Sequence, residues 1–380
     1  MSRAQAEWLS SVFAEFRPSL VDDPLADFSG FRLQGAPCCQ VTPRRPDTVA
    51  RIVRLAHARN IPVRIRAQAH SLNGSSLPVP GELLLSTGNV RHVSFDEPGT
   101  VTVGCGVVLW ILQHILRRHG FDIPVLNDGY PGPSVGGYIA AGGFGPRSAE
   151  YGGFWNNVLE VLLVDGCGRQ RQIASRDPLF PWLFGSMGQL GVFLEARLAI
   201  IPLNASGSPK YPAGTKLVAP RLVEPKVPPE YATDGQERLF WFTLFTPDEH
   251  LDEAHRDLSV LESRHRASLR FQERYRYPIL PRGTVAPLVY PYARPFTATG
   301  AWGWLTDSSP DGIDALHEFD RGFMALAASK PHYRRYVQSE LPSGPETYRQ
   351  CFGEEMYRAL QSHKAETDPG SLLDRGSVFA

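Results

Sequence analysis

The chain has 380 residues, of which 42% are hydrophobic, and its 39 lysine and arginine residues balance 39 aspartate and glutamate residues. One hydrophobic core rarely extends over so long a chain, so we expect two lobes. Without net charge the protein has no overall field that would draw it to nucleic acid or to an anionic membrane, and we predict neither as a partner.

The cysteines are few and scattered, at Cys38, Cys39, Cys105, Cys167 and Cys351. They show neither the framework of a disulfide-rich secreted domain nor the CxxC spacing of a zinc site, so we predict free thiols and no metal site. The amino-terminal stretch MSRAQAEWLSSVFAEF lacks the continuous apolar segment of a signal peptide. No apolar run approaches the roughly 20 residues that span a bilayer. These patterns predict a cytoplasmic protein.

The first part of the chain has the pattern of a mixed α/β lobe. A helix is predicted to begin near Asp47 or Thr48, either of which can cap it, and to end at Asn60. The alternating residues 61–65 predict a strand that leads directly into RAQAHSLNGSS. The segment ELLLSTGNV predicts another strand, and VTVGCGVVLWILQHILRRHG predicts a strand, a turn and a helix that ends near Gly120.

Glycine is unusually dense in the stretch GYPGPSVGGYIAAGGFGPRSAEYGG, from Gly129 to Gly153. Each glycine destabilises a regular element by about 0.5–1 kcal/mol relative to alanine, so some backbone requirement must offset this cost. Close approach of main-chain NH groups to a large anionic ligand is one such requirement, and a set of tight turns is the other. The segments NVLEVLLVDG and GVFLEARLAIIPL, which follow, predict buried strands.

The composition changes after Leu203, where proline, glycine and polar residues indicate a domain boundary. Beyond it, ERLFWFTLF predicts a strand and PDEHLDEAHRDLSVLESRHR a charged helix, whose histidines we interpret as part of a solvated face. We expect a first domain over 1–203, a smaller α+β substrate domain over 204–345, and a carboxy-terminal segment over 346–380.

Four blocks of the sequence together resemble FAD-binding proteins of the vanillyl alcohol oxidase (PCMH) type, and cytokinin dehydrogenases above all. RAQAHSLNGSS is similar to the family's turn Arg-Gly-x-Gly-His-Ser-x-x-Gly, and SVGGYIAAGGFGPRSAEYGGFWNNVLEVLLVDGCG to its second glycine-rich loop. FPWLFGSMGQLGVFLEARLAIIPL is similar to its strand-closing segment, and YRQCFGEEMYRALQSHKAETDPGSLLDRGSVF to its carboxy-terminal helix and Asp-Pro turn. The resemblance implies an α+β fold, in which a PCMH-type FAD-binding domain of two α/β subdomains carries a smaller substrate domain and receives the carboxy-terminal segment.

The resemblance also implies where FAD binds. In the family, backbone NH groups of the first turn hold the pyrophosphate, and the motif histidine is often bonded covalently to the flavin 8-methyl carbon. Carried over, His70 becomes the attachment residue, and a loop histidine satisfied by backbone groups is the alternative interpretation. The implied cofactor-binding residues are Arg66, Ala67, Gln68, Ala69, His70, Ser71, Val135, Gly136, Gly137, Gly142, Gly145 and Val192.

The sequence departs from the family pattern at three positions. Ala67 and Ala69 stand where the family usually has glycine, so either the turn needs no positive φ there or it binds the cofactor less tightly. Gly132 stands where doubly linked relatives carry a second flavin-bonding cysteine, so a single covalent link is the most we expect.

A flavin carries the redox step, while the protein orients the substrate and manages the proton. Asp128 is the nearest match to the family's catalytic aspartate, and a turn aspartate in Asn-Asp-Gly is its alternative interpretation. The other candidates for the pocket above the flavin are Tyr290 and Tyr292, together with Tyr275 and Tyr277. Alternating aromatic residues in a strand are, however, often ordinary packing.

These inferences predict an FAD-dependent oxidase or dehydrogenase that oxidises a small alcohol or amine by hydride transfer to the flavin, in specialised metabolism. We expect a small-molecule substrate, molecular oxygen or another electron acceptor, and a monomer or homodimer. Two alternatives stay open. One is a reductase that binds FAD without a covalent link and takes electrons from NADPH, and the other is a binding protein on the same fold that has lost its flavin.

Overall fold

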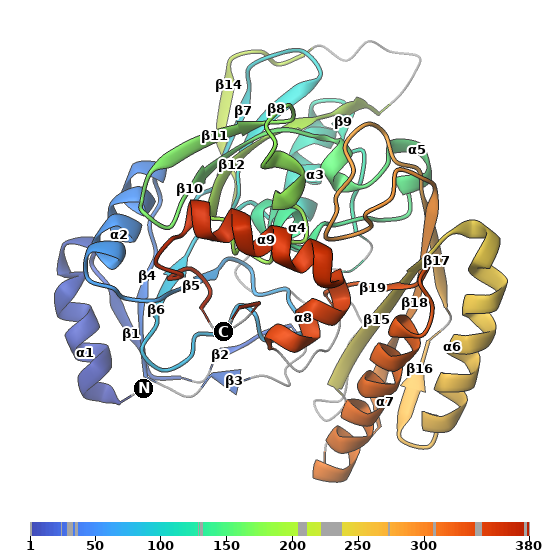
Figure 1. The fold of residues 1–380 in the computed structure, drawn as a ribbon. Coiled ribbons are helices and arrows are strands. Elements are labelled where there is room, and N and C mark those ends of the chain that lie inside the picture. The colour runs from blue at the N-terminus through green and yellow to red at the C-terminus, as the bar shows by residue number, and fades with distance from the viewer. Residues whose placement is uncertain are drawn as a thin grey trace.

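The computed structural model describes residues 2–23, 25–28, 33–34, 37–127, 129, 132–203, 211–221, 238–272, 274–306, 309–338, 344–375 and 378–379. Figure 1 shows two lobes, of which one contains both chain termini and the other is formed by residues 238–338. Several sheets and helices alternate along the chain, which confirms the predicted mixed α/β class. Within the described ranges, no helix combines the length and the apolar character needed to cross a membrane.

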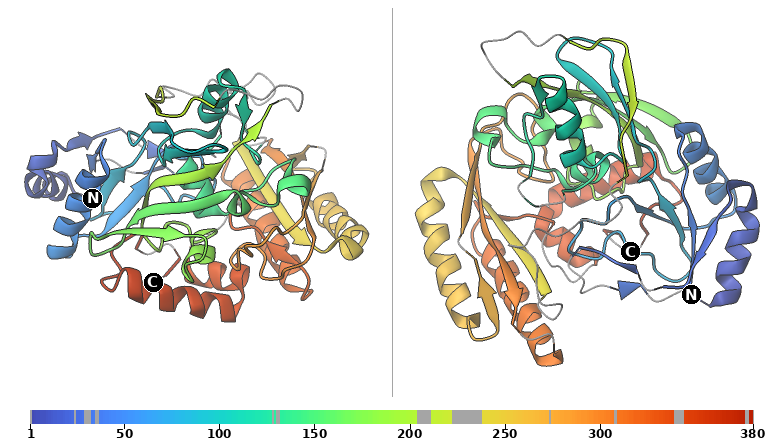
Figure 2. Two further views of the ribbon diagram at one scale, coloured as in Figure 1. Left: turned by 90° about the horizontal axis from the view of Figure 1, so that it is seen from above. Right: turned by 180° about the vertical axis from the view of Figure 1, so that it is seen from behind.

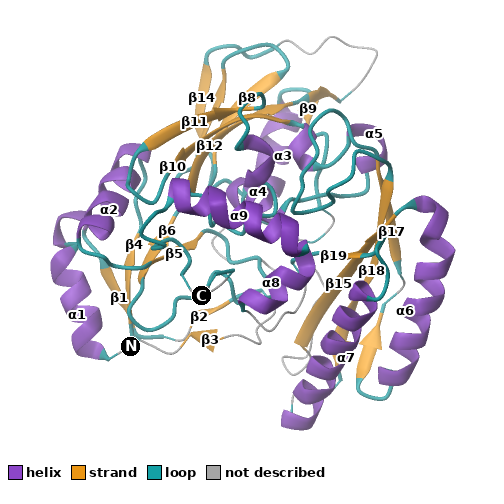
Figure 3. Ribbon diagram, viewed as in Figure 1, coloured by secondary structure: helices purple, strands orange, loops and turns teal. Residues whose placement is uncertain are grey.

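The amino-terminal subdomain is a four-stranded sheet with the strand order β1-β4-β6-β5, flanked by two helices (Figure 3). Its elements are β1 (Ser19–Val21), β4 (Cys38–Val41), β5 (Val63–Arg66), β6 (Leu83–Ser86), α1 (Arg3–Val12) and α2 (Pro46–Ala58). Strands β4, β6 and β5 are parallel, and β1 runs antiparallel to β4. Val49, Ile52 and Val53 of α2 lie at helical spacing and are buried in the core of this subdomain. Strand β5 forms an edge of the sheet and leads into the turn at 66–71.

The second subdomain is a six-stranded antiparallel sheet with the order β11-β10-β12-β8-β7-β14. Its strands are β7 (His92–Phe95), β8 (Thr100–Gly104), β10 (Val158–Val164), β11 (Gln170–Ala174), β12 (Val192–Ala199) and β14 (Thr215–Val218). Helices α3 (Leu109–Arg118) and α4 (Val135–Ala141) bury Leu112, Leu116 and Ile139 in its core. The short elements of this lobe are η1 (Ala14–Phe16), β2 (Leu25–Ala26), β3 (Leu33–Gln34), β9 (Phe121–Asp122), α5 (Ser148–Tyr151), η2 (Phe154–Asn156), η3 (Phe180–Leu183) and β13 (Ile201–Pro202).

The other lobe is a five-stranded antiparallel sheet with two helices packed side by side on one face (Figure 2). Its elements are β15 (Arg238–Thr246), η5 (Asp248–His250), α6 (Leu251–His265), β16 (Leu269–Phe271), β17 (Tyr275–Ile279), β18 (Phe296–Leu305), α7 (Pro310–Ala328) and β19 (Arg334–Arg335). Side chains alternate along β15, so Phe240, Phe242 and Leu244 are buried with the helices. Trp241 therefore lies on the opposite face, which leaves an aromatic surface for another role.

The carboxy-terminal segment returns to the first lobe after helices α8 (Pro345–Phe352) and α9 (Glu354–Thr367). Leu373 forms a parallel bridge with Val63 of β5 and is fully buried in the amino-terminal core. The Val63 NH donates to the Leu372 carbonyl over 2.8 Å, and the Asp374 NH donates to the Val63 carbonyl over 2.8 Å. Residues 372–374 thus extend the parallel sheet at the edge formed by β5.

Some local details differ from the expectations. Helix α2 begins at Pro46, and no side chain caps it, because proline at the first helical position already has the backbone angle that a helix needs. Strand β14 continues the sheet of the first lobe beyond residue 203, where composition alone indicates a boundary. All five cysteines are free thiols.

Candidate active site

A large cavity lies between the lobes, and its described lining comes from the turn after β5, the start of α4, the returning carboxy terminus and the sheet of the second lobe. Its empty volume is about 1320 Å³, including the open mouth. The cavity is therefore the place where these four segments, distant in sequence, come together.

The turn after β5 forms one wall, through Ala67, Gln68, Ala69, His70 and Ser71. In the described part of the chain, the backbone NH groups of these five residues donate no hydrogen bond. Four of the five residues are partly exposed, so these donors are open to water or to a bound acceptor from outside the chain. Successive NH groups that border one cavity form a binding site for an anion such as a pyrophosphate.

The backbone of this turn contains a residue in the left-handed region. Ala69 has a φ of +54°, whereas Ala67 does not have a positive φ. For a residue other than glycine this conformation costs about 1–2 kcal/mol. The two alanines therefore differ, because only Ala69 occupies a position that favours glycine.

His70 lies in the same wall, and its ring packs against the ring of Phe28 with the centroids 4.4 Å apart. Burial lowers the pKa of its imidazole to about 4, so the ring is neutral at physiological pH. Its Nδ1 is enclosed and has no hydrogen-bond partner within the described ranges. The neutral ring therefore has one nitrogen that no described group engages.

The start of α4 forms a second wall, which includes Ser134, Gly136 and Gly137. Its backbone donors are already used, since the Gly136 NH donates to the Cys105 carbonyl over 2.9 Å and the Gly137 NH to Ser134 Oγ over 3.1 Å. A Cβ atom on Gly136 would lie 2.9 Å from Cβ of Cys105, so a larger residue does not fit there. This wall contributes shape rather than anion-binding donors.

Aromatic rings of the second lobe form the third wall. Trp241 and Trp302 stack with their centroids 5.1 Å apart and an interplanar angle of 15°, and Tyr275 stacks on Tyr277 with centroids 5.0 Å apart. Trp241 Nε1 donates to the Tyr275 hydroxyl over 2.9 Å, and Tyr336 packs edge-on against Trp241. All five rings line the cavity. Stacking and this hydrogen bond hold the wall rigid.

The wall formed by the turn that contains His70 and the wall formed by the aromatic rings meet at Gly129. A Cβ atom on Gly129 would lie 3.6 Å from Nε2 of His70 and 3.5 Å from Cζ2 of Trp302. His70 and Trp302 therefore border the same part of the cavity. A molecule bound there contacts both the turn and the aromatic surface.

Several residues expected at the cofactor lie outside the lining, namely Arg66, Val135, Gly142, Gly145 and Val192. The Arg66 guanidinium turns away and donates to the Ala26 carbonyl over 2.8 Å. Val135 and Val192 are fully buried in the hydrophobic cores. Gly142 ends α4 with a φ of +69°. A Cβ atom on Gly145 would lie 1.9 Å from the Leu126 carbonyl oxygen. These five residues shape the lobe around the site.

The predicted catalytic residues lie in different places. Asp128 lies outside the described residues, so its role as a base stays a prediction. Tyr290 stacks on Phe296 with the centroids 4.1 Å apart and is buried away from the cavity, and Tyr292 is exposed at the surface. Tyr275 and Tyr277, the other tyrosines of the sequence analysis, do line the cavity.

Sequence reasoning did not identify Trp241, Trp302, Tyr336 or Asp374, all of which line the cavity. The period-two alternation in ERLFWFTLF places Trp241 on the face opposite Phe240 and Phe242, and this signal could have found it. Asp374 reaches the cavity through the return of the chain end to the first lobe, which the resemblance implies, although the sequence analysis did not single out this side chain.

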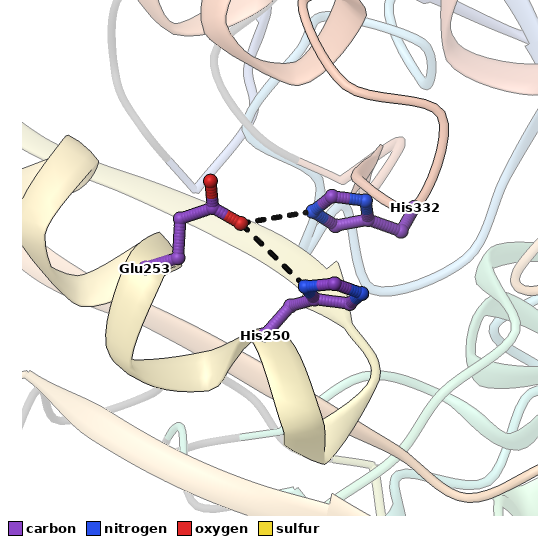
Figure 4. A group of neighbouring side chains, drawn as sticks. All are labelled: His250, Glu253 and His332. Carbon is purple, nitrogen blue, oxygen red and sulfur yellow. Dashed lines mark ion pairs between the residues drawn. The ribbon is translucent and has the colours of Figure 1, made fainter.

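A separate cluster joins α6 to the segment after α7. Figure 4 shows His250 and His332 directed toward one carboxylate oxygen of Glu253, at 3.5 and 3.3 Å. The two imidazole rings are stacked, with the centroids 3.7 Å apart and an interplanar angle of 14°. Lys330 Nζ lies 2.8 Å from the other oxygen of Glu253. A metal bound by both rings would have to lie in both ring planes, which here are nearly parallel, so the geometry favours an ion-pair cluster over a metal site.

Comparisons with known proteins agree with the geometry of the cavity. Residues 37–174 match the FAD binding domain family. The D-lactate dehydrogenase of Archaeoglobus fulgidus is 32% identical over 170 residues, which are 43% of this chain and 38% of that protein. Cytokinin dehydrogenase 2 of Oryza sativa subsp. japonica is 27% identical over 201 residues, which are 47% of this chain and 35% of that protein.

A third relative is the reticuline oxidase of Eschscholzia californica, which is 25% identical over 197 residues, covering 51% of this chain and 36% of that protein. The chain thus matches little more than a third of the length of these relatives. The comparisons confirm the resemblance to FAD-binding flavoproteins that the sequence blocks imply.

Proposed function

Because the chain carries an FAD-binding domain, we propose that it is an FAD-dependent oxidoreductase that oxidises a small alcohol or amine. The observation that supports this proposal is that residues 67–71, whose NH groups have no partner among the described residues, line the same cavity as the stacked aromatic rings of the second lobe. When bound, FAD supplies the two-electron acceptor that no side chain provides. The residues of the chain bind the cofactor, orient the substrate and exclude water.

In this proposal the pyrophosphate is held by the backbone NH groups of Ala67 to Ser71 alone. The donors at the start of α4 are engaged within the protein, so that wall confines the cofactor by shape. Asn127 adds a second enclosed polar atom, because its Oδ1 has no hydrogen-bond partner among the described residues. The described residues therefore fit a large ligand with an anionic group and polar ring atoms.

We further propose that His70 is the site of covalent attachment to the flavin. The support is its position in the cavity wall and the pKa of about 4, which leaves a neutral imidazole with a nucleophilic nitrogen at physiological pH. Joining an imidazole nitrogen of His70 to the 8-methyl carbon would replace one N–H and one C–H bond by a C–N bond. The two electrons and two protons released would reduce molecular oxygen to hydrogen peroxide.

The wall opposite the turn suggests the kind of substrate. Among the described residues that line the cavity there is no lysine or arginine, so none of them offers a carboxylate substrate a permanent cation. The stacked rings of Trp241 and Trp302 favour an apolar or aromatic substrate, and aromatic faces also attract ammonium groups. These features favour an alcohol or amine over a hydroxy acid.

The test is purification followed by anaerobic reduction. We expect a yellow protein whose flavin stays with the pellet after acid denaturation and whose absorbance bleaches with an aromatic alcohol or amine but not with D-lactate. The His70→Ala variant should release its flavin into the supernatant. The control His119→Ala changes a histidine that does not line the cavity and should leave attachment intact. A colourless protein that binds no FAD would overturn the proposal, and reoxidation in air would identify oxygen as the acceptor.

A further inference from the structure

Five charged side chains are buried together where the carboxy-terminal segment meets β5. They are Arg64, Glu82, Lys364, Asp368 and Asp374, and none has more than 5% of its surface exposed. Burying an ionised group without a partner is costly, so the pairing within this cluster decides which of its members are charged.

Four of the five form two complete pairs. Arg64 Nε and Nη2 each donate to a different carboxylate oxygen of Glu82, both over 2.9 Å. Lys364 Nζ lies 2.7 Å from Oδ2 of Asp368. The cluster thus holds three carboxyl groups for two cations. Asp374 is the third carboxyl, and Arg64 Nη1 lies 3.8 Å from its Oδ1.

The carboxyl group of Asp374 also borders the cavity. Its Oδ1 accepts a hydrogen bond from the Ile65 NH over 2.9 Å. A Cβ atom on Gly188 would lie 2.6 Å from its Oδ2, and Ile65, Gly188 and Asp374 together line the cavity. The peptide NH of Asp374 is tied to the Val63 carbonyl. The return of the chain therefore places this side chain in the wall of the proposed FAD site.

We propose that Asp374 is a cofactor-contacting residue that carries a proton when FAD is bound. This inference rests on the proposed function of the cavity. Three observations support it, namely the excess of carboxyl groups over cations, the burial of the side chain, and its place in the cavity wall. A diphosphate in the same cavity adds negative charge, which further disfavours an ionised carboxyl. A protonated carboxyl group can instead donate a hydrogen bond to the cofactor.

The charges around Asp374 set its titration. Burial raises its pKa to about 7, the Glu82 carboxylate beside β6 acts in the same direction, and Arg64 of β5 and Lys364 of α9 oppose it. The ligand-free protein therefore loses this proton near neutral pH. Because FAD binds the protonated form, the affinity should fall by about 20-fold between pH 6.5 and 8.5, as the linkage of proton and ligand binding requires.

The test measures FAD binding across pH. His70→Ala protein freed of flavin is titrated with FAD from pH 6 to 8.5, so that no covalent link obscures the equilibrium, and FAD fluorescence reports the dissociation constant. We expect the constant to rise about 20-fold between pH 6.5 and 8.5. Asp374→Asn keeps the shape and a hydrogen-bond donor but cannot ionise. Its dissociation constant for FAD should therefore change less than about twofold between pH 6.5 and 8.5.

The matched control is Asp122→Asn, which alters a buried carboxyl outside this cluster that does not line the cavity and should keep the pH dependence. Asp374→Ser serves as a second variant in case the amide misfolds, and it too should lose the dependence. This inference alone would be overturned if the FAD dissociation constant of the His70→Ala protein did not change with pH. It would also be overturned if both Asp374 variants kept the full 20-fold pH dependence of that constant. A failure to bind FAD at every pH would overturn the proposed function with it.

Discussion

Replacing Ala69 by glycine should stabilise the cofactor-free protein, although glycine usually destabilises. Ala69 has a φ of +54°, and a left-handed backbone costs a residue with a Cβ about 1–2 kcal/mol. Glycine escapes this cost but loses more freedom on folding, which costs about 0.5–1 kcal/mol. The net gain in the free energy of unfolding should be about 0.5–1 kcal/mol. Ala67→Gly in the same turn relieves no such strain and should lose about 0.5–1 kcal/mol.

The assay is urea unfolding of the two variants and the parent, all without cofactor, followed by circular dichroism and tryptophan fluorescence. The difference between the two glycine variants isolates the effect of φ, because both remove one methyl group from neighbouring positions, and it should reach about 1–2 kcal/mol. Equal m-values would show that the unfolded states are comparable. Equal destabilisation by both substitutions would refute the argument that Ala69 is strained.

Three further predictions follow from buried charges and from the sequence. Between pH 4 and 6.5, His70, whose pKa is about 4 in the folded protein against an ordinary 6.5, makes the free energy of unfolding rise with pH. Asp374, whose pKa is about 7 against an ordinary 3.8, makes it fall over the same range. In urea titrations of cofactor-free protein, the free energy of unfolding should therefore increase more with pH in Asp374→Asn than in the parent, and less in His70→Ala, and equal pH dependence in all three proteins would contradict both assignments. Lys364→Met leaves Asp368 buried without its cation and should lower the free energy of unfolding by about 3–5 kcal/mol, while the exposed pair tested by Arg358→Met should change it by less than about 1 kcal/mol. Asp128→Asn should slow flavin reduction by substrate about 10²–10⁴-fold at an unchanged flavin spectrum, and an unaltered rate would assign Asp128 to the turn.

The sequence predicts the elements whose signals are local. The strand β5 and the turn after it follow from alternating apolar residues and from a motif within eleven residues, and helix α2 follows from apolar spacing. Helix α2 begins at Pro46 and not at a side-chain cap formed by Asp47 or Thr48, because either a capping side chain or a proline can begin a helix. The composition after residue 203 marks a boundary, yet β14 pairs with β7, because pairing between strands depends on tertiary contacts.

The parts of the site that the sequence did not predict depend on contacts between distant segments. Asp374 and Ile65 are 309 residues apart, so no window of sequence joins them. Tyr290 and Tyr275 have similar surroundings in sequence, but only the strand register of the second lobe turns Tyr275 into the cavity. Arg66 belongs to the motif by position, while its guanidinium finds the Ala26 carbonyl on another segment.

The carboxy-terminal return links completion of the fold to completion of the site. Strand β5 would be an unpaired edge without Leu372 and Leu373, and an unpaired parallel edge favours association with other chains. The same residues place Leu373 in the amino-terminal core and Asp374 in the cavity wall. A ligand that binds only the folded state stabilises it by about 2.7 kcal/mol at a hundred times its dissociation constant. Because a proposed FAD contact lies on the returning segment, FAD would stabilise the docked chain end specifically, and the docked end would in turn protect the β5 edge that leads into the turn at residues 66–71.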